Sequence, residues 1–492
     1  MSSTFSGYSI AVSGMYVNQA ALSVTSNNLS NINTTGYSRK QISSSETVVQ
    51  QNTSSVGTGT SVAAINRARN QMLDQTYRQQ NAQAGYWQAK SVNLEDAATT
   101  LSEFSANDGS SDNGLQQTIQ EFFNSWEELA KDPSSLSSRQ SVIEYAKSLV
   151  DTLSSVDEQL QALQWDAAAK VKDSVTELND LAAQVADLNQ QIKQQEISGA
   201  EASDLRDERD ALLDSMSALT NITVREQQDG TVAVTIGGVY LVQGNKTNTL
   251  AVTGNGSADQ PLTVEWSNLE QKAHLDGGSI QAYLEDADQS SVTAVDSDSL
   301  PYDYSAESTS SIANLRQSLN VLMTTIAVEI NSIHSAGTGL DGTTSGLAFF
   351  TPIDESQPLS ISNMQVNPEL EADTNKIAAS ADGAAGDNTV ASKIAEVANG
   401  DIFLYDGLTM DSNSFYQSII SWLGTVGDNA NSSYTNQSAL VAQINNQRLS
   451  ISSVSLDEEM SNMIMYQNSY SASARVLGVI DGLVADMIEE LG

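Results

Sequence analysis

The C-terminal end of the chain carries a regular repeat of apolar side chains. Between 449 and 491 these side chains follow the a and d positions of one heptad register, the pattern of a coiled coil. Ser452, Glu459 and Ser473 interrupt the series. Its apolar members are Leu449, Leu456, Met463, Tyr466, Tyr470, Leu477, Ile480, Val484, Met487 and Leu491. The repeat predicts one long C-terminal helix that packs lengthwise against another helix.

The N-terminal end shows the same spacing in a shorter form. Gln19 is the polar member of a series made up of Phe5, Tyr8, Val12, Met15 and Leu22. Two terminal stripes of this kind predict two helices that bury each other. Such a pair has no further layer to cover its outer faces, so we expect it to need neighbouring molecules. This is typical of a protein that assembles.

Helical periodicity also dominates the middle of the chain. From about Ser137 to Gln195 apolar residues keep a spacing of three and four, with a stutter near Val171 and Val175 that locally unwinds a coil. Shorter helices are predicted at Arg67–Glu103, Gly114–Lys131, Ser203–Leu219 and Ser311–Ile333. We interpret these segments as a helical bundle.

The period changes to two after residue 221. Ile222 and Val224 alternate with polar residues, as do the apolar residues from Val232 to Ile236, and Asp229-Gly230 lies between the two runs. Asp-Gly between alternating runs predicts a β-hairpin. A stretch rich in Ser, Asp, Gly and Thr continues to about 310, which favours a small β-rich domain that projects from the helical body.

These patterns predict a mainly α fold with a β-rich inserted domain. We expect an inner coiled-coil domain from 1–66 and 450–492, and a helical middle domain from 67–220 and 311–449. The remaining part, 221–310, is expected to form a small outer domain. At 492 residues the chain is long enough for several domains.

The net charge of the chain limits the kinds of molecule that it is expected to bind. The chain has 22 basic and 61 acidic residues and a net charge of −39. Proteins bind nucleic acids largely by neutralising phosphates with Lys and Arg, so we expect no nucleic-acid partner. Anionic lipid is repelled for the same reason. The charge favours solubility, whereas assembly has to overcome the repulsion between copies unless salt screens it.

Cysteine and targeting patterns add further limits. The chain has no Cys, which removes disulfides, thiolate nucleophiles and zinc–thiolate sites. The first basic residue is Arg39, so the positive start of a Sec signal peptide is missing. No apolar run reaches the length of a membrane span, and we expect no membrane insertion. These features fit a cytoplasmic protein, and equally a protein exported unfolded through a dedicated channel.

Candidate chemical sites are weak. Gly337, Gly339 and Gly342 fit a dinucleotide fingerprint, but a predicted helix precedes them and a loop follows. His274 and His334 are far apart and are interpreted as capping or packing residues. The acidic groups at 204–210 and 285–288 could supply paired carboxylates for glycoside hydrolysis. However, Arg206 and Arg209 interleave the first group, which favours a salt-bridged helix face. We predict no catalytic, cofactor-binding or metal-binding residues.

A family resemblance starts in the N-terminal motif. Residues 26–39 read Ser-Asn-Asn-Leu-Ser-Asn-Ile-Asn-Thr-Thr-Gly-Tyr-Ser-Arg, which is similar to the N-terminal motif of flagellar rod, hook and junction subunits. The Tyr-Ser-Arg ending resembles the hook-associated protein 1 (FlgK) family, although Thr35 stands where members often have Pro. Similar stretches follow in family order at 205–214, 331–350, 377–388, 456–460 and 466–476.

This resemblance implies a structural subunit at the junction between hook and filament, not an enzyme. It implies export in unfolded form by the flagellar type III apparatus, with an export chaperone beforehand in the cytoplasm. Outside the cell, the implied partners are a ring of identical subunits, the hook protein and a second hook-associated junction protein. The terminal helices would form the inner domain around the axial channel.

Heptad positions and motif positions together give the residues expected in assembly. These are Phe5, Tyr8, Val12, Met15, Leu22, Asn27, Asn28, Asn31, Asn33, Gly36, Tyr37, Arg39, Met463, Tyr466, Tyr470, Arg475, Leu477, Ile480, Val484, Met487 and Leu491. Asn tolerates unusual backbone conformations and caps backbone groups, so the Asn-rich motif predicts the end of the first helix. The number of Asn residues exceeds the need of one turn and favours contacts between subunits.

Three alternatives stay open on these residues. A hook or rod subunit belongs to the same class, but Arg39, Arg475 and the long helix at 137–195 argue against it. The second alternative is a secreted adhesin whose β-rich domain binds surfaces. The third is a cell-wall hydrolase.

Overall fold

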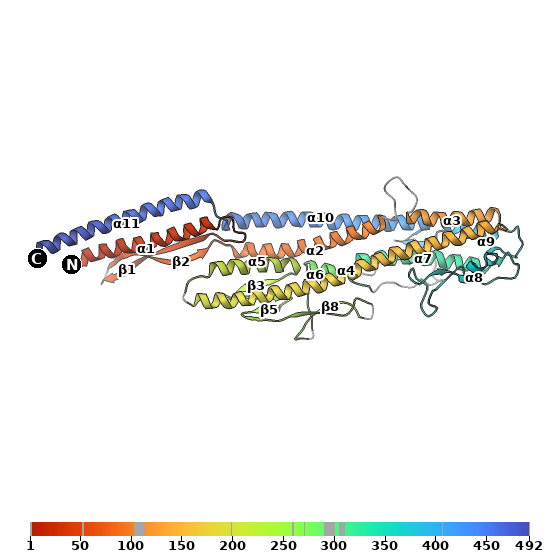
Figure 1. Cartoon of the computed structure of the whole chain (residues 1–492), viewed down its shortest axis with the longest axis horizontal. Helices are drawn as coiled ribbons and strands as arrows, with labels where there is room; N and C mark the ends of the chain where they lie inside the picture. The colour runs from red at the N-terminus through yellow and green to blue at the C-terminus, as the bar shows by residue number, and fades with distance from the viewer. Residues whose placement is uncertain are drawn as a thin grey trace.

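The computed structural model shows an elongated, mainly helical molecule with both chain termini at the same end (Figure 1). It describes residues 2–51, 54–102, 114–197, 199–257, 260–269, 271–289, 301–304, 310–405 and 407–491. A narrow part, formed by both ends of the chain, leads into a longer body made of the middle of the sequence. We call the narrow part the arm.

The arm consists of two helices and one long hairpin. Helix α1 (Ser2–Ser30) runs antiparallel to α11 (Leu456–Leu491), so that Gly7 lies beside Ile480 and Gly14 beside Ser473. Strands β1 (Lys40–Gln51) and β2 (Ser54–Arg67) pair antiparallel with two register shifts. The hairpin packs along α1, where the backbone N–H of Thr60 donates to Ser13 Oγ at 3.1 Å.

The body is organised along the 61-residue helix α4 (Leu136–Glu196). Pro133 and the capping side chain of Ser135, which accepts from the Ser138 N–H, precede this helix. Around it lie α2 (Gln71–Ser102), α3 (Leu115–Lys131), α5 (Ser203–Leu219), α7 (Ser311–Ser335), α9 (Thr389–Glu396) and α10 (Ser412–Ser452). Helix α10 runs beside α2, and Gln437 Nε2 donates to the backbone oxygen of Gln80 at 3.0 Å.

Two hydrophobic cores hold the body together. The first lies far from the arm, where α3, α7, α9 and the first half of α4 meet. It contains Phe122, Trp126 and Phe349, and the rings of the last two lie 5.3 Å apart. The second core joins the second half of α4, including Val171 and Val175, to α5 and to the strands that follow α5.

Those strands form two small antiparallel sheets. The first has the order β3 (Thr223–Glu226), β4 (Val232–Ile236), β5 (Val239–Gln243) and β6 (Lys246–Thr247). The second has the order β7 (Leu250–Thr253), β8 (Thr263–Trp266) and β9 (Gln271–Lys272), and helix α6 (Ser279–Asp286) follows. Gly230 turns the β3–β4 hairpin with a φ of 80°, as the Asp-Gly pattern predicts.

Short elements complete the end of the body that lies away from the arm. Strand β10 (Tyr302–Tyr304) pairs with β15 (Phe403–Tyr405), which also pairs with β16 (Leu408–Met410). The other pairs are β11 (Thr338–Gly339) with β14 (Ala378–Ser380), and β12 (Phe350–Thr351) with β13 (Gln365–Val366). Helix α8 (Pro368–Ala372) and two 3₁₀ turns, Thr374–Lys376 and Val397–Asn399, lie between them.

The mainly α fold with small sheets is confirmed, and so are the helices predicted in the middle of the chain. The expected boundary at 220/221, however, runs through the second core. Val232, Val234 and Ile236 on β4 pack in the same cluster as α4 and α5. The β-rich segment therefore lies against the helical body and does not project freely from it.

Two features of the arm differ from the sequence expectation. The C-terminal heptad repeat is not one helix, because α10 ends at Ser452 and α11 begins at Leu456. The long β1–β2 hairpin was not predicted at all. Its strands are rich in Ser, Thr and Gly and show little alternation, so the sequence carries a weak strand pattern there.

Candidate assembly interface

Helix α11 turns its predicted heptad positions towards α1. Six of these side chains are half-buried there: Met463, Tyr466, Tyr470, Leu477, Ile480 and Val484. Met487 and Arg475 are exposed, as is Leu456 before them, so these side chains lie outside the contact between the helices. The side chains of Phe5 and Leu491 fall outside the described residues.

Helix α1 meets its neighbours mainly through small residues. Val12, Met15 and Leu22 are half-buried, but Tyr8 is 47% exposed, so its predicted place in the seam is wrong. Gly7 and Gly14 lie against α11, and Asn28 bonds Glu459 at the start of that helix. The residues at heptad spacing from them on α1 are also small or polar: Ala11, Asn18, Ala21 and Thr25. Small side chains let α11 approach closely, while the larger ones lie to the side of this stripe. Their seven-residue recurrence was the signal that sequence reasoning missed.

Helix α11 also carries large apolar side chains that α1 leaves exposed. We call this set of exposed side chains the outer stripe: Met460, Ile464, Met465, Val476, Val479, Leu483, Met487 and Ile488. Val479 is 64% exposed and Leu483 53%. Helix α1 adds Ile10 and Tyr16, the latter 69% exposed, and has no charged residue along its whole length. The arm therefore presents apolar side chains with little charge between them.

The Asn-rich motif is used largely within the chain. Asn28 is buried, and its Oδ1 accepts from the Lys40 N–H at 2.9 Å. Its Nδ2 donates to the Lys40 backbone oxygen at 2.9 Å and to Glu459 Oε2 at 3.1 Å. The Tyr37 hydroxyl lies 3.0 Å from Asn27 Oδ1 and 2.9 Å from Asn28 Oδ1. These bonds end α1 and fix the start of β1.

The rest of the motif forms the turn itself. The backbone N–H and Nδ2 of Asn31 both donate to the backbone oxygen of Asn27. Gly36 has a φ of 81°, a left-handed conformation that favours glycine, and Asn33 is exposed. The expected turn is confirmed. The surplus of Asn that favoured contacts between subunits is explained, for Asn27, Asn28 and Asn31, by contacts within the chain.

Arg39 links the motif to the start of α11. Its guanidinium binds Glu458 through two bonds of 2.7 and 3.0 Å, and Glu459 Oε1 through Nε at 2.8 Å. Its backbone N–H donates to the Ser452 oxygen at 2.8 Å, at the end of α10. Such two-pronged pairs are geometrically specific. Arg39 thus helps to hold the break between α10 and α11.

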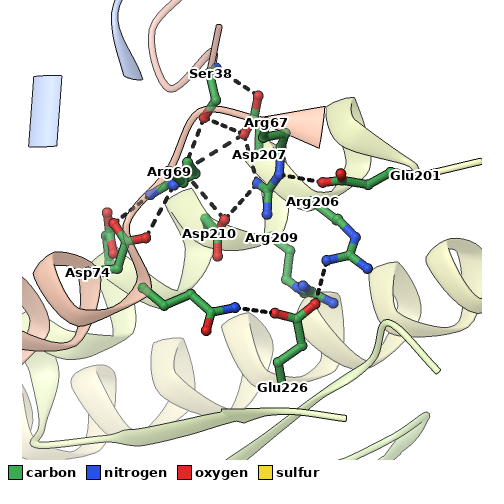
Figure 2. A network of polar contacts seen from close by, with 12 residues as sticks. Ser38, Arg67, Arg69, Asp74, Glu201, Arg206, Asp207, Arg209, Asp210 and Glu226 are labelled. Atoms are coloured by element: carbon green, nitrogen blue, oxygen red, sulfur yellow. Dashed lines mark hydrogen bonds and ion pairs between the residues drawn. The ribbon is translucent and has the colours of Figure 1, made fainter. Parts of the chain in front are cut away.

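A network of ion pairs fixes the arm on the body (Figure 2). Asp207 on α5 accepts from the Ser38 N–H and hydroxyl at 2.8 and 2.6 Å, and from Arg67 Nη1 at 2.8 Å. Arg67 also binds Asp210 at 2.8 Å, and Arg69 binds Asp74 at 2.9 Å. We call this set, together with Arg78, Asp214 and Arg448, the joint network.

The joint network continues into α2 and α10. Asp214 binds Arg78 at 2.7 Å and Arg448 at 2.7 Å, and Arg448 also binds Asp74. Burial alone would raise the pKa of Asp210, but the charges of Arg69, Arg67 and Arg78 outweigh it and lower this pKa to about 2. The carboxylate is therefore charged at neutral pH.

The acidic helix face at 204–210 was predicted to be salt-bridged, and this is confirmed, but the arginines that pair with it come from other elements. Asp207 and Asp210 are buried and face arginines of β2 and its connection to α2. Arg206 points to the other side and binds Glu196 and Glu226. Arg209 donates through Nη1 to Asn189 Oδ1 at 3.0 Å and to the Gly230 oxygen at 2.8 Å. Asp207 and Asp210 are three residues apart and therefore share one face of α5, which takes part in the joint network.

The other candidate sites are occupied by packing interactions. His334 is buried, and burial lowers its pKa to about 4, so its ring is neutral. Its Nε2 accepts from the Ala378 N–H at 2.9 Å, and Nδ1 lies 2.8 Å from the Leu347 oxygen. The Gly337–Gly342 stretch follows a helix, α7, and leads into a loop, as expected, but it also contains the short strand β11, which was not predicted.

The described residues contain neither a candidate metal site nor a candidate membrane span. They contain no group of three or more His, Cys, Asp or Glu side chains placed to hold a metal ion. Among the same residues, no helix combines the length and the apolar character needed to cross a membrane.

The molecule has a long helical body and a weakly charged, apolar arm made from both chain ends. This architecture is typical of structural subunits that assemble into larger complexes. The family model for the flagellar hook-associated protein FlgK helical domain matches residues 104–350. The chain belongs to this FlgK family. Two models of flagellar basal-body rod proteins match its ends, at 9–37 and at 445–489, which form the arm and the end of α10.

Curated relatives match along the whole chain. Flagellar hook-associated protein 1 of Bacillus subtilis is 28% identical, over 100% of this chain and 99% of the relative. The proteins of the same description from Salmonella typhimurium and Escherichia coli K12 are 26% and 25% identical, over 96% and 97% of this chain and 97% and 98% of theirs. The solved flagellar hook junction protein FlgK of Burkholderia pseudomallei has the same fold, with a TM-score of 0.60 and 14% identity over 77% of this chain and 100% of that one.

Proposed function

We propose that the chain is the structural subunit that joins the flagellar hook to the filament, and that copies of it assemble through the arm. Family membership supports the role. One structural observation supports assembly through the arm. Residues 1–66 and 450–492 make up less than a quarter of the chain, yet they contain more than half of the large apolar side chains that are exposed in the described structure. Exposed apolar patches of this kind mark interaction surfaces.

The outer stripe of α11 is the part of the arm that we expect to bury most on assembly. Helix α1 half-buries the seam side chains of α11, whereas those of the outer stripe stay exposed. Covering a side chain such as Val479 or Leu483 contributes about 1.5–3 kcal/mol each. The uncharged surface of α1 adds no repulsion between copies of a chain whose net charge is −39.

The expected division of labour follows. Residues 1–66 and 450–492 form the inner domain around the axial channel, 67–220 and 311–449 the middle domain, and 221–310 faces outwards. The assembly residues predicted from the sequence act in this inner domain. Those that line the contact between α1 and α11 pair the two helices, and those of the motif set the arm on the body. A ring of identical subunits then contacts the hook protein on one side and the second hook-associated junction protein on the other.

We infer the location and the absence of catalysis from the same features. The subunit is exported unfolded from the cytoplasm, with an export chaperone bound beforehand, and works outside the cell. The acidic groups that suggested a hydrolase are engaged in ion pairs: Asp286 binds Lys90 at 2.7 Å and Asn93 at 2.7 Å, and Asp207 and Asp210 bind arginines. This favours a structural role for them.

Complementation of a deletion strain tests the proposal. Leu483→Asp puts a charge into the outer stripe and should give hooks without filaments, with filament subunits shed into the medium, because a buried charge without a partner is costly. Leu136→Asp is the matched control: it is 55% exposed, at the start of α4, and should support normal filaments. Circular dichroism of both purified variants should match the wild type. Normal filaments with Leu483→Asp, or hooks that are themselves missing, would contradict the proposal.

A further inference from the structure

A cavity of about 730 Å³ next to the joint network is lined by an unusual number of arginines. Arg67, Arg69, Arg78, Arg206, Arg209 and Arg225 all border it. The whole chain has 22 basic residues against 61 acidic ones. Five carboxylates also line the cavity, so its walls carry a small excess of positive charge in a strongly negative protein. We call it the arginine cavity.

Arg209 carries a buried charge that no carboxylate balances directly. It is 1% exposed, and the bonds of its Nη1 go to neutral oxygens, those of Asn189 and Gly230. Its Nε is buried without a hydrogen-bond partner among the described residues. Burial lowers the pKa of Arg209 to about 10, because the neighbouring charges do not compensate the loss of water. A buried cation in this state favours a nearby anion.

Arg225 supplies a second uncompensated charge at the edge of the same cavity. It lies on β3 with an exposed side chain. Among the residues that the structure describes, no ion pair of Arg225 or of Arg209 brings a carboxylate oxygen within 4.0 Å, whereas the other four arginines are all paired. Arg225 at the rim and Arg209 in the wall thus carry positive charges without a carboxylate partner. A ligand of opposite sign fits between them.

We propose that the arginine cavity binds a small multivalent oxyanion of the phosphate type. The guanidinium group presents paired N–H donors that match the oxygens of a phosphate, and its charge does not depend on pH in the neutral range. The ligand is small, because the cavity volume excludes a polymer and the rest of the surface repels one. Chloride has no paired oxygens, so we do not expect it to bind in the cavity.

Occupancy would stabilise the joint. The walls of the cavity come from the connection between β2 and α2, from Glu196 at the end of α4, from α5 and from β3. An anion that binds between them ties the base of the arm to the first sheet and to the long helix. The arginine cavity is thus a ligand site of the body, separate from the outer stripe through which copies assemble.

Calorimetric titration of the full chain with inorganic phosphate tests this, with sodium chloride of equal ionic strength as the reference. We expect saturable binding of one phosphate per chain and a rise in the unfolding temperature that chloride does not give. Arg225→Gln should weaken the phosphate affinity roughly tenfold, which corresponds to about 1.4 kcal/mol, because one bond to a charged group is lost. Lys246→Gln, an exposed cation on β6 away from the cavity lining, is the matched control and should bind as the wild type does.

We choose Arg225 because its side chain is exposed, so that Arg225→Gln should keep the fold. The unfolding temperature of this variant in sodium chloride verifies this. Arg209→Gln is the second variant and should abolish phosphate binding where it folds. The proposal is overturned by titrations without saturation, by equal stabilisation in phosphate and in chloride, or by a phosphate affinity that Arg225→Gln leaves unchanged.

Discussion

At the scale of single residues, Asp207 shows how much a carboxylate depends on its surroundings. It accepts two hydrogen bonds from Ser38 and one from Arg67, and only 8% of its side chain is exposed. Asp204, one turn earlier on the same helix, binds Lys40 with a side chain that is 75% exposed. The two residues have the same chemistry, but one lies in the joint and the other in solvent.

We therefore expect Asp207→Asn to destabilise the chain by about 2–3 kcal/mol, because bonds between charged groups in buried surroundings are lost. Asp204→Asn should cost less than about 1 kcal/mol, as exposed pairs do. Urea unfolding of both purified variants at pH 7 measures the difference. Equal losses would show that Asp207 is not held in the network as described.

The sequence revealed the turn residues but not the burial of charges. Asp229-Gly230 and Gly36 follow from local backbone preferences, and both were predicted correctly. The partners of Asp207 lie more than a hundred residues away in the chain, at Ser38 and Arg67. No local pattern encodes such a pairing, because it depends on how the arm meets the body.

At the scale of secondary-structure elements, the α1–α11 pair differs from the helices of the body. Val142, Leu149 and Leu160 on α4 are completely buried, whereas Leu477 and Ile480 on α11 are only half-buried. Elements with little buried apolar surface open at low free-energy cost. The arm should thus be the least stable part of the free subunit and gain stability on assembly.

Hydrogen exchange of the purified monomer tests this. Residues 2–30 and 456–490 should exchange fast and be cut by proteases, while α4 stays protected. Leu477→Asp should leave the main unfolding transition of the monomer within about 2 °C of the wild type but prevent attachment to hooks, because the charge is costly only when the seam is packed. Protection of the arm equal to that of α4, or a large fall in melting temperature with Leu477→Asp, would rule out folding on assembly.

Helices of the body could be predicted from their periodicity to within a few residues, but the break at 453–455 was missed. Ser-Val-Ser contains neither Gly nor Pro, the usual helix breakers, and the one local signal is Ser455 with Glu458, which have the spacing of a capping box. The break is held by contacts from another segment: the Arg39 N–H bonds the Ser452 oxygen, and the Arg39 guanidinium bonds Glu458 and Glu459. The β1–β2 hairpin escaped prediction for a similar reason, since it is stabilised by packing on α1.

At the scale of the whole molecule, charge is distributed unevenly. The ranges 1–66 and 450–492 hold three basic and eight acidic residues, while the remainder holds nineteen and fifty-three. Nearly all of the net charge of −39 is therefore carried by the body. Bodies that lie side by side repel each other strongly, whereas the arms, with three basic and eight acidic residues, repel each other much less.

Self-association of the purified chain should therefore increase with salt. Raising sodium chloride from 0.1 to 1 M shortens the screening length from about 10 to about 3 Å, which weakens repulsion between the bodies and leaves apolar contacts of the arms intact. Sedimentation velocity at one protein concentration measures the effect, and Leu483→Asp should remain monomeric in both buffers. Association that decreases with salt would mean that charge pairs, and not the outer stripe, hold the copies together.

The position of the two termini has a practical consequence for labelling. Because α1 begins and α11 ends at the same tip of the arm, a fluorescent protein fused to either end would have to fit into the part of the molecule proposed to be most crowded after assembly (Figure 1). A reporter that leaves motility intact belongs in a surface turn of the body, such as the one at Gly238 between β4 and β5, which is exposed and has open space around it.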